Sequence, residues 1–247
     1  MNSKNEISMD RGSFNNHEAI LKRFSAVSIY AVAMGYLESA VVIYLRESVY
    51  GNSGQVFPFR LMEPYLGQVE FVREAATIVM LLAIGYLAGK NIFQKWMFFV
   101  YSFAVWDIFY YMFLRIFTGW PNSLGDFDVL FLIPVVWVSP VIAPILISLL
   151  LTLESTTLIF LSTKSERLKI SISSVGLFLL GAGAVFYSFT EPVICILISQ
   201  GPNGLKGFTP ISFDWVTFLI GFLLMCLSSI KIVRECYHII KSEDVIQ

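Results

Sequence analysis

Long apolar stretches recur along this chain of 247 residues and constrain its fold more than any other feature. A helix needs about 20 mainly apolar residues to cross the hydrocarbon core of a bilayer. Only helices and closed barrels satisfy their backbone hydrogen bonds there. The sequence therefore predicts an all-α fold, a polytopic transmembrane helix bundle with six spans. The apolar stretches lie at about residues 24–45, 69–88, 96–117, 129–162, 170–192 and 215–233.

The composition agrees with this prediction and excludes one class of protein. Hydrophobic residues make up 56% of the chain and charged residues 14%, whereas a soluble domain carries roughly 25% charged residues. A net charge of −1 argues against a nucleic-acid-binding protein, which needs a basic surface. We therefore expect the lipid bilayer as the partner of this chain, and a small solute or an ion as its ligand, with no nucleic acid.

Cysteine and histidine are too sparse for a recognisable metal site. Cys195, Cys226 and Cys236 are scattered and form no CxxC pair, so their spacing supports neither a zinc site nor a disulfide framework. His17 and His238 lie outside the apolar stretches, which removes the common histidine-based chemistry from the membrane region. We expect no metal site and no cofactor.

The Lys and Arg residues alternate between loops, and this alternation predicts the orientation. The basic segments are the N-terminal head, the loops around residues 90–95 and 164–169, and the C-terminal tail. Basic loops remain on the cytoplasmic side of a membrane. Six spans with both termini in the cytoplasm satisfy this rule. The predicted organisation is a flexible polar head at residues 1–22, a transmembrane domain at 23–235 and a short cytoplasmic tail at 236–247.

The fourth apolar stretch is too long for one straight crossing and contains Pro134, Pro140 and Pro144, so we expect a fourth span that is broken at proline. In one alternative, residues 129–162 form a single long, tilted helix with proline kinks. In the other, Ser139 and Pro140 begin a new helix. Residues 130–138 would then form a short re-entrant segment, whose backbone must lie against protein or water.

Three outer segments, at residues 47–68, 118–128 and 200–213, are longer than the inner loops and carry turn-forming residues. The first is also rich in aromatic residues. These segments either cover the outer face as a lid or are ordinary interfacial loops.

Glu38, Glu74 and Asp107 lie inside apolar helices, where a carboxylate is costly unless it faces the bundle interior or a wet cavity. At 1.5 Å per residue, Glu38 and Asp107 lie about 21 Å and about 16 Å from the inner ends of their helices. Asp107, Tyr111 and Arg115 are spaced by four and share one helix face. The candidate substrate- or ion-binding residues are Glu38, Arg73, Glu74, Asp107, Tyr111 and Arg115.

Two interpretations of this polar cluster remain open at the level of sequence. The charges either pair with one another and lock the helices together, or they line an outward-facing pocket. The second gives the leading hypothesis, an integral membrane protein that transports a small solute or an ion. The alternatives are a membrane-embedded enzyme acting on a lipid-linked substrate, and a non-catalytic subunit or assembly factor of a membrane complex. No catalytic motif is visible, which counts against the enzyme, and enzymatic activity stays open.

Four phrases of the sequence resemble a known group of proteins. They are YLESAVVIYLRE at residues 36–47, REAATIVMLLAIGYLAG at 73–89, WDIFYYMFLRIFTGWP at 106–121 and DVLFLIPVVWVSPVIAP at 128–144. In these phrases the chain resembles an uncharacterised family of bacterial polytopic integral membrane proteins, over roughly its first two thirds. The resemblance implies a location in the bacterial cytoplasmic (inner) membrane and attaches no activity.

Overall fold

The computed structural model describes residues 2–52, 54, 56–165 and 168–246, with side chains described between residues 18 and 243 of these ranges. Within the described residues, six helices are long and apolar enough to span a membrane. This confirms the predicted all-α bundle. The helices are α1 (Asn2–Tyr50), α2 (Pro64–Ala88), α3 (Ile92–Thr118), α4 (Ile142–Leu161), α5 (Ile172–Gln200) and α6 (Trp215–Ile246).

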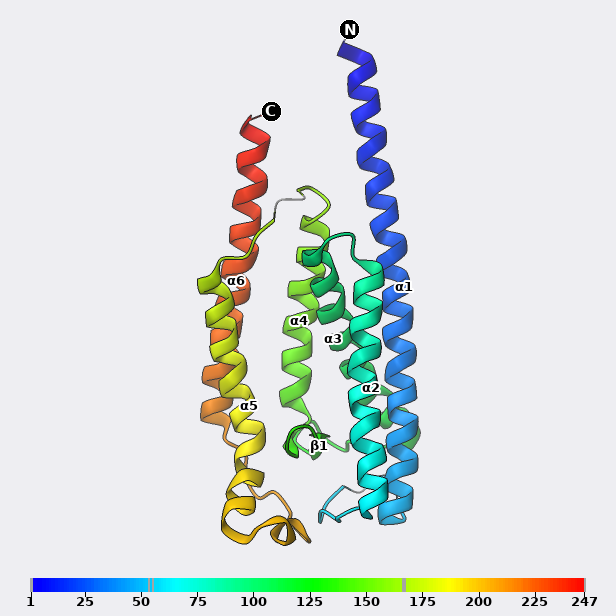
Figure 1. The fold of residues 1–247 in the computed structure, drawn as a ribbon, viewed down its shortest axis with the longest axis vertical. Helices are drawn as coiled ribbons and strands as arrows, with labels where there is room; N and C mark the ends of the chain where they lie inside the picture. The colour runs from blue at the N-terminus through cyan, green and yellow to red at the C-terminus, as the bar shows by residue number, and fades with distance from the viewer. Residues whose placement is uncertain (1, 53, 55, 166–167, 247) are drawn as a thin grey trace.

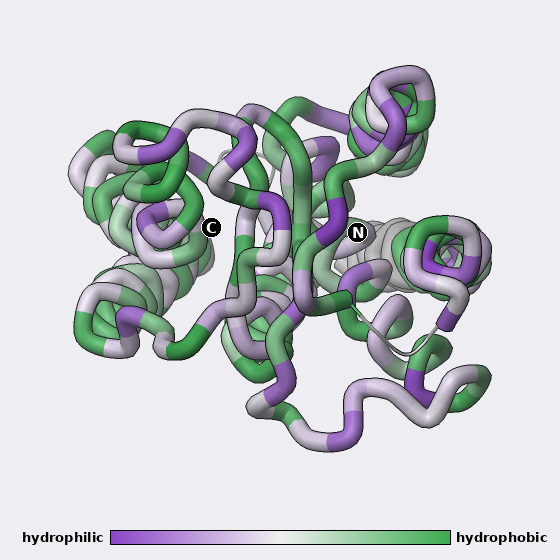
Figure 2. Tube along the Cα trace, turned by 90° about the horizontal axis from the view of Figure 1, so that it is seen from below, coloured by the Kyte–Doolittle hydropathy of each residue, from purple (hydrophilic) through white to green (hydrophobic). Residues whose placement is uncertain are grey.

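The helices form two groups that meet at α4. In the first group, α3 packs against α1, α2 and α4, and in the second α5 packs against α6. Contacts between α4 and α6 join the groups, and α4 stands between them in Figure 1. Both termini lie at the same end of the molecule (Figure 1), as an even number of crossings requires. The opposite end carries loops in which hydrophilic and hydrophobic residues are interspersed (Figure 2).

The predicted domain bounds, at residues 22/23 and 235/236, stay a prediction. The helix α1 begins at Asn2, so the backbone of the predicted head is helical from that residue on. The side chains of residues 1–17 lie outside the described part, and the flexibility of the head stays a prediction. The predicted tail, from residue 236, continues α6 as far as Ile246.

The prediction that residues 129–162 form one long kinked helix is wrong, because a β-hairpin precedes α4. The strands β1 (Phe127–Phe131) and β2 (Trp137–Pro140) pair antiparallel before α4 begins at Ile142. The predicted break inside a span is therefore not confirmed, because the prolines Pro134 and Pro140 belong to this hairpin. Residues 130–138 are the part of the hairpin that crosses from one strand to the other. Of these residues Val138 is buried, Pro134 is exposed and the others are partly buried.

Side-chain caps and turns fix where several helices begin and end. Asn91 accepts a hydrogen bond from the backbone of Gln94 and starts α3, which ends at Gly119 with a positive φ of 74°. Ser171 caps α5 in the same way as Asn91. Asp214 accepts a hydrogen bond from the backbone of Thr217 at the start of α6. Hydrogen bonds from Thr217 also hold the pKa of the Asp214 carboxyl below its ordinary value.

Glycines allow the closest helix contacts. A Cβ atom at Gly181 of α5 would lie 2.6 Å from the carbonyl oxygen of Gly221 in α6. A Cβ atom at Gly221 would lie 2.7 Å from the carbonyl oxygen of Gly181. The α5–α6 pair is therefore a close backbone contact of the kind that small residues permit between membrane helices.

We expect Gly181→Val to destabilise the protein by about 1–3 kcal/mol, because the added methyl groups must push two backbones apart. Gly183→Val is the matched control, since a Cβ at Gly183 meets nothing within 4 Å and the intrinsic cost of Val in a helix is the same. Unfolding of both variants in detergent, followed by circular dichroism, measures the difference. Equal midpoints for the two variants would show that this contact contributes no packing energy.

Candidate functional site

A small polar cavity lies where α1, α2 and α3 meet the β1 strand and the loop that follows α1. Its volume is about 90 Å³. Residues of the first outer segment, among them Val56, Phe59 and Arg60, form part of its wall. The ionisable side chains of acids and arginines that line it are Glu38, Arg46, Arg60, Glu70, Arg73, Glu74, Asp107 and Asp128.

Arg73 binds two of these carboxylates and shares its single positive charge between them. Its Nη1 atom donates to Glu38 at 2.6 Å, which joins α2 to α1. Its Nη2 and Nε atoms donate to the two oxygens of Glu70 at 2.6 and 2.8 Å. Thr77 adds a hydrogen bond of 3.3 Å to Glu38. A forked guanidinium that holds two carboxylates is a geometry that lysine cannot reproduce.

A second buried ion pair joins α1 to the hairpin. Arg46 donates to Asp128 at 2.8 Å, and both side chains are almost fully buried. Asp128 also accepts the backbone N–H of Val129 and the hydroxyl of Tyr110. The Arg46 guanidinium lies 4.1 Å from the ring centroid of Trp120, a cation–π contact. One of its nitrogens, Nη1, is buried and makes no hydrogen bond within the described residues.

Glu74 and Asp107 differ from the paired carboxylates because their partners are neutral. Glu74 accepts the backbone N–H of Leu132 at 2.9 Å. Asp107 accepts the hydroxyl of Ser148, on α4, at 2.8 Å. Among the described residues no Lys or Arg lies within ion-pair distance of either carboxylate. Glu74 and Asp107 are therefore the described carboxylates of the polar cavity that form no ion pair.

A larger apolar cavity of about 530 Å³ adjoins the polar one. It lies between α3 and α4 on one side and α5 and α6 on the other, with the hairpin at one end. Asp107, Leu130 and Phe131 line both cavities. Asp107 is thus the one ionisable residue, within the described part of the chain, that faces both spaces.

The structure brings together five of the six predicted site residues. Glu38, Arg73, Glu74, Asp107 and Tyr111 all line the polar cavity. Arg115 does not, because its guanidinium donates to the carbonyl oxygens of Gly119 and Pro121 at the exposed end of α3. Each step of four residues overshoots a helical turn by about 40°. Two such steps turn Arg115 away from the face that carries Asp107.

Sequence reasoning missed Arg46, Glu70 and Asp128 as site residues. A signal for Glu70 was visible, since it lies four residues before Glu74 on the same helix face. The pairing of Arg46 with Asp128 could not be foreseen, because it depends on the β-hairpin that folds residue 128 back against α1.

Comparison with known proteins gives no identification. The chain matches no protein-family model, no curated protein and no solved structure. The site must therefore be interpreted from its own chemistry. Among the described residues, no group of three or more His, Cys, Asp or Glu side chains is placed to hold a metal ion. What the site offers is a set of fixed ion pairs beside two carboxylates with neutral partners.

We expect Arg73→Gln to destabilise the protein by about 3–5 kcal/mol, because it leaves Glu38 and Glu70 buried without a cation. Adding Glu38→Gln and Glu70→Gln to this variant should restore most of the loss, since the uncompensated charges are then removed. Arg115→Gln is the control, because Arg115 contacts only backbone carbonyls at an exposed helix end. Unfolding by urea in detergent measures all of these variants. If Arg73→Gln were as stable as Arg115→Gln, the role assigned to the ion pairs of Arg73 would be contradicted.

Proposed function

We propose that this integral membrane protein is a carrier that binds a proton or another cation in the polar cavity and couples it to the movement of a solute. The observation that carries the proposal is the position of Asp107. It is ionisable, it has only a hydroxyl partner, and it lines both cavities. Ionisable residues held inside a membrane bundle in this way mark ion and proton pathways.

The charge of the polar cavity supports a cationic ligand. Five carboxylates and three guanidinium groups line it, so a fully ionised lining has two more negative than positive charges. Arg46 pairs with Asp128, Arg73 shares its charge between Glu38 and Glu70, and Glu74 and Asp107 form no ion pair among the described residues. A bound cation, or protons on Glu74 and Asp107, would offset the excess. This compensation lowers the cost of keeping carboxylates away from water.

The size of the polar cavity limits what it can hold. A water molecule needs roughly 10–15 Å³ of such a cavity, so about 90 Å³ holds a few waters or one small ion. Pockets for organic ligands have volumes of roughly 300–1,000 Å³. An organic solute therefore fits the adjoining cavity of about 530 Å³ and not the polar one.

A second candidate function rests on the ion pairs alone. The contacts Arg73–Glu38 and Arg46–Asp128 fix α1 against α2 and the hairpin, and buried pairs can serve geometry instead of catalysis or transport. A non-catalytic subunit or assembly factor would need no more than this. A structural role of this kind does not explain why Asp107 and Glu74 lie in the polar cavity without a cationic partner.

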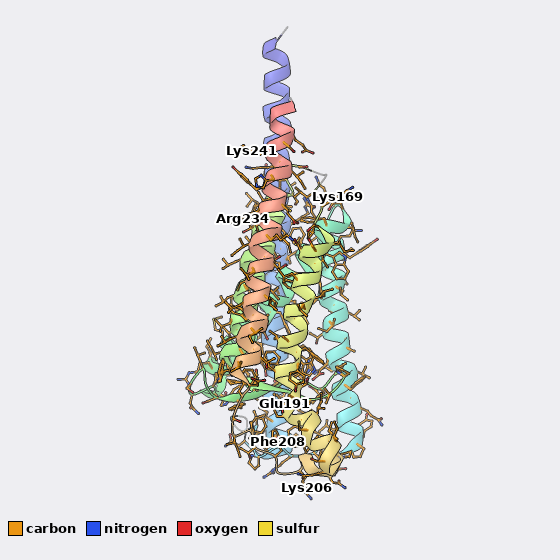
Figure 3. The ribbon with its side chains drawn as sticks, turned by 90° about the vertical axis from the view of Figure 1, so that its left-hand side faces the viewer. Lys169, Glu191, Lys206, Phe208, Arg234 and Lys241 are labelled. Carbon is orange, nitrogen blue, oxygen red and sulfur yellow. The ribbon has the colours of Figure 1, made fainter. Side chains whose placement is uncertain are left out.

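We also propose the cytoplasmic (inner) membrane of a bacterium as the location, with both termini inside. Lys169, Arg234 and Lys241 lie toward the end that carries the termini, whereas Glu191 and Lys206 lie toward the other end (Figure 3). A basic end of this kind supports the cytoplasmic side for the termini. Under this orientation the polar cavity, with the loop residues that line it, faces outward.

The proposal predicts proton exchange against a cation in proteoliposomes that contain a pH-sensitive dye. Gradients of sodium, potassium or tetraethylammonium ions are imposed, and the internal pH is followed. Asp107→Asn and Glu74→Gln should each lower the cation-driven pH change by about tenfold or more, because the neutral side chains no longer exchange a proton. Glu47→Gln, an exposed carboxylate of α1 outside the cavity, is the matched control. Wild-type fluxes in both cavity variants would overturn the proposal.

A further inference from the structure

The apolar cavity has walls that suit an organic ligand. Its volume of about 530 Å³ falls within the range of pockets that bind such ligands. Seven aromatic side chains line it, contributed by α3, the hairpin and α5. They are Phe99, Phe103, Phe131, Trp137, Phe178, Phe186 and Phe189. Several of these rings touch one another, since Trp137 lies 4.9 Å from Phe186 and 5.3 Å from Phe131 between ring centroids.

The charge of this cavity has a single sign. Asp107 and Glu154 line it, and no Lys, Arg or His is among its described lining residues. Each carboxylate has a hydroxyl partner, Ser148 for Asp107 and Ser229 for Glu154, both at 2.8 Å. The protein thus places two acids in an apolar wall and supplies no cation for either. An isolated carboxylate in such surroundings is costly, and a ligand that brings a positive charge removes the cost.

These two properties select one class of ligand. An anion is excluded by the two carboxylates. A small inorganic cation would lose its hydration shell against a wall that is almost entirely apolar. A hydrophobic cation satisfies both properties, because its body replaces water on the aromatic wall and its charge meets a carboxylate and the faces of the rings. Aromatic rings stabilise quaternary and other organic cations in this way.

The placement of α5 leaves room for such a ligand. This helix packs against α6 and against β2, and its contacts with α3 and α4 are at most slight. The cavity occupies the space left between them. The four helices that form its walls, α3, α4, α5 and α6, are all candidate membrane spans, so we expect a hydrophobic cation to reach the cavity from the bilayer.

We propose that the apolar cavity binds a lipophilic organic cation, with Asp107 as the group that meets its charge and the aromatic residues as the wall that holds its body. This inference rests on the proposed carrier function for its meaning, since it names the substrate class of that carrier. The binding itself is measured without transport, so the two proposals can fail separately.

The test uses purified full-length protein in detergent and equilibrium dialysis with radiolabelled tetraphenylphosphonium. Triphenylphosphine oxide, which has a similar aromatic body and no net charge, is the matched neutral probe. We expect tetraphenylphosphonium to bind at least about tenfold more tightly than the neutral probe. Asp107→Asn should lower the affinity for the cation by about tenfold and leave the weak binding of the neutral probe unchanged.

The wall is tested by a pair of variants on α4. Leu151→Trp adds a bulky ring at a residue that lines the cavity, and Leu153→Trp adds the same ring two residues away at an exposed site. The added ring should displace part of the ligand body, equivalent to roughly two methylene groups. Leu151→Trp should therefore bind the cation about tenfold more weakly. Leu153→Trp should bind as the wild type does. This pair keeps the proposal testable even if Asp107→Asn does not fold.

Each outcome decides the proposal. Equal affinity for the charged and neutral probes, or equal affinity of the two tryptophan variants, would overturn it. Selective binding that depends on Asp107 and Leu151 supports it, even if the proteoliposomes show no flux, in which case the carrier function fails alone. Flux of sodium or potassium without binding of tetraphenylphosphonium would leave the carrier function and refute this substrate class.

Discussion

An uncompensated charge is expensive inside a membrane, and the rest of this structure depends on how that cost is met at α1. This helix carries Glu38 and Arg46, about two turns apart. Glu38 pairs with Arg73 of α2, and Arg46 pairs with Asp128 of the hairpin. Two elements from distant parts of the sequence are thereby fixed to one helix. Since breaking a buried pair costs more than forming it contributes, the pairs specify position more than they add stability.

The hairpin provides a second anchor for the charged groups of the polar cavity. A helix would use its own backbone N–H groups, whereas the irregular backbone after β1 leaves the N–H of Leu132 free to bind Glu74. At the same time Trp137 packs against Phe186 of α5, and Leu130 and Phe131 line both cavities. The hairpin therefore separates the polar space from the apolar one and holds a carboxylate without supplying a charge. Non-helical backbone is tolerated at membrane depth where it lies against protein or water, and Asp128, Val138 and Ser139 of the hairpin are buried.

The sequence predicts the spans well and the site only in part, because local properties can be read from the sequence and contacts between distant segments cannot. Hydrophobic length is a local property, so the six spans could be located from the apolar stretches, although α4 begins at Ile142 and not near residue 129. Glu38 and Arg73 could be grouped by their depth in the membrane, because depth follows from position along a helix. The hairpin could not be predicted, since three prolines are compatible with a kinked helix as well as with a turn. Arg115 was misplaced because helical phase accumulates with distance, and Asp128 was missed because its partner is brought to it by the hairpin.

The division between paired and unpaired acids has a consequence for how the two cavities can act together. Carboxylates fixed by arginine cannot exchange their charge partner without a large cost, so Glu38, Glu70 and Asp128 serve as a rigid frame. Asp107, held by a single hydroxyl, can accept either a proton or the charge of a cationic ligand. It cannot accept both, because a protonated acid no longer attracts a cation. Under the proposed function, occupancy of one cavity thus weakens binding at the other, and by linkage the effect is reciprocal. One carboxylate shared by two cavities is then sufficient for exchange of a proton against a hydrophobic cation.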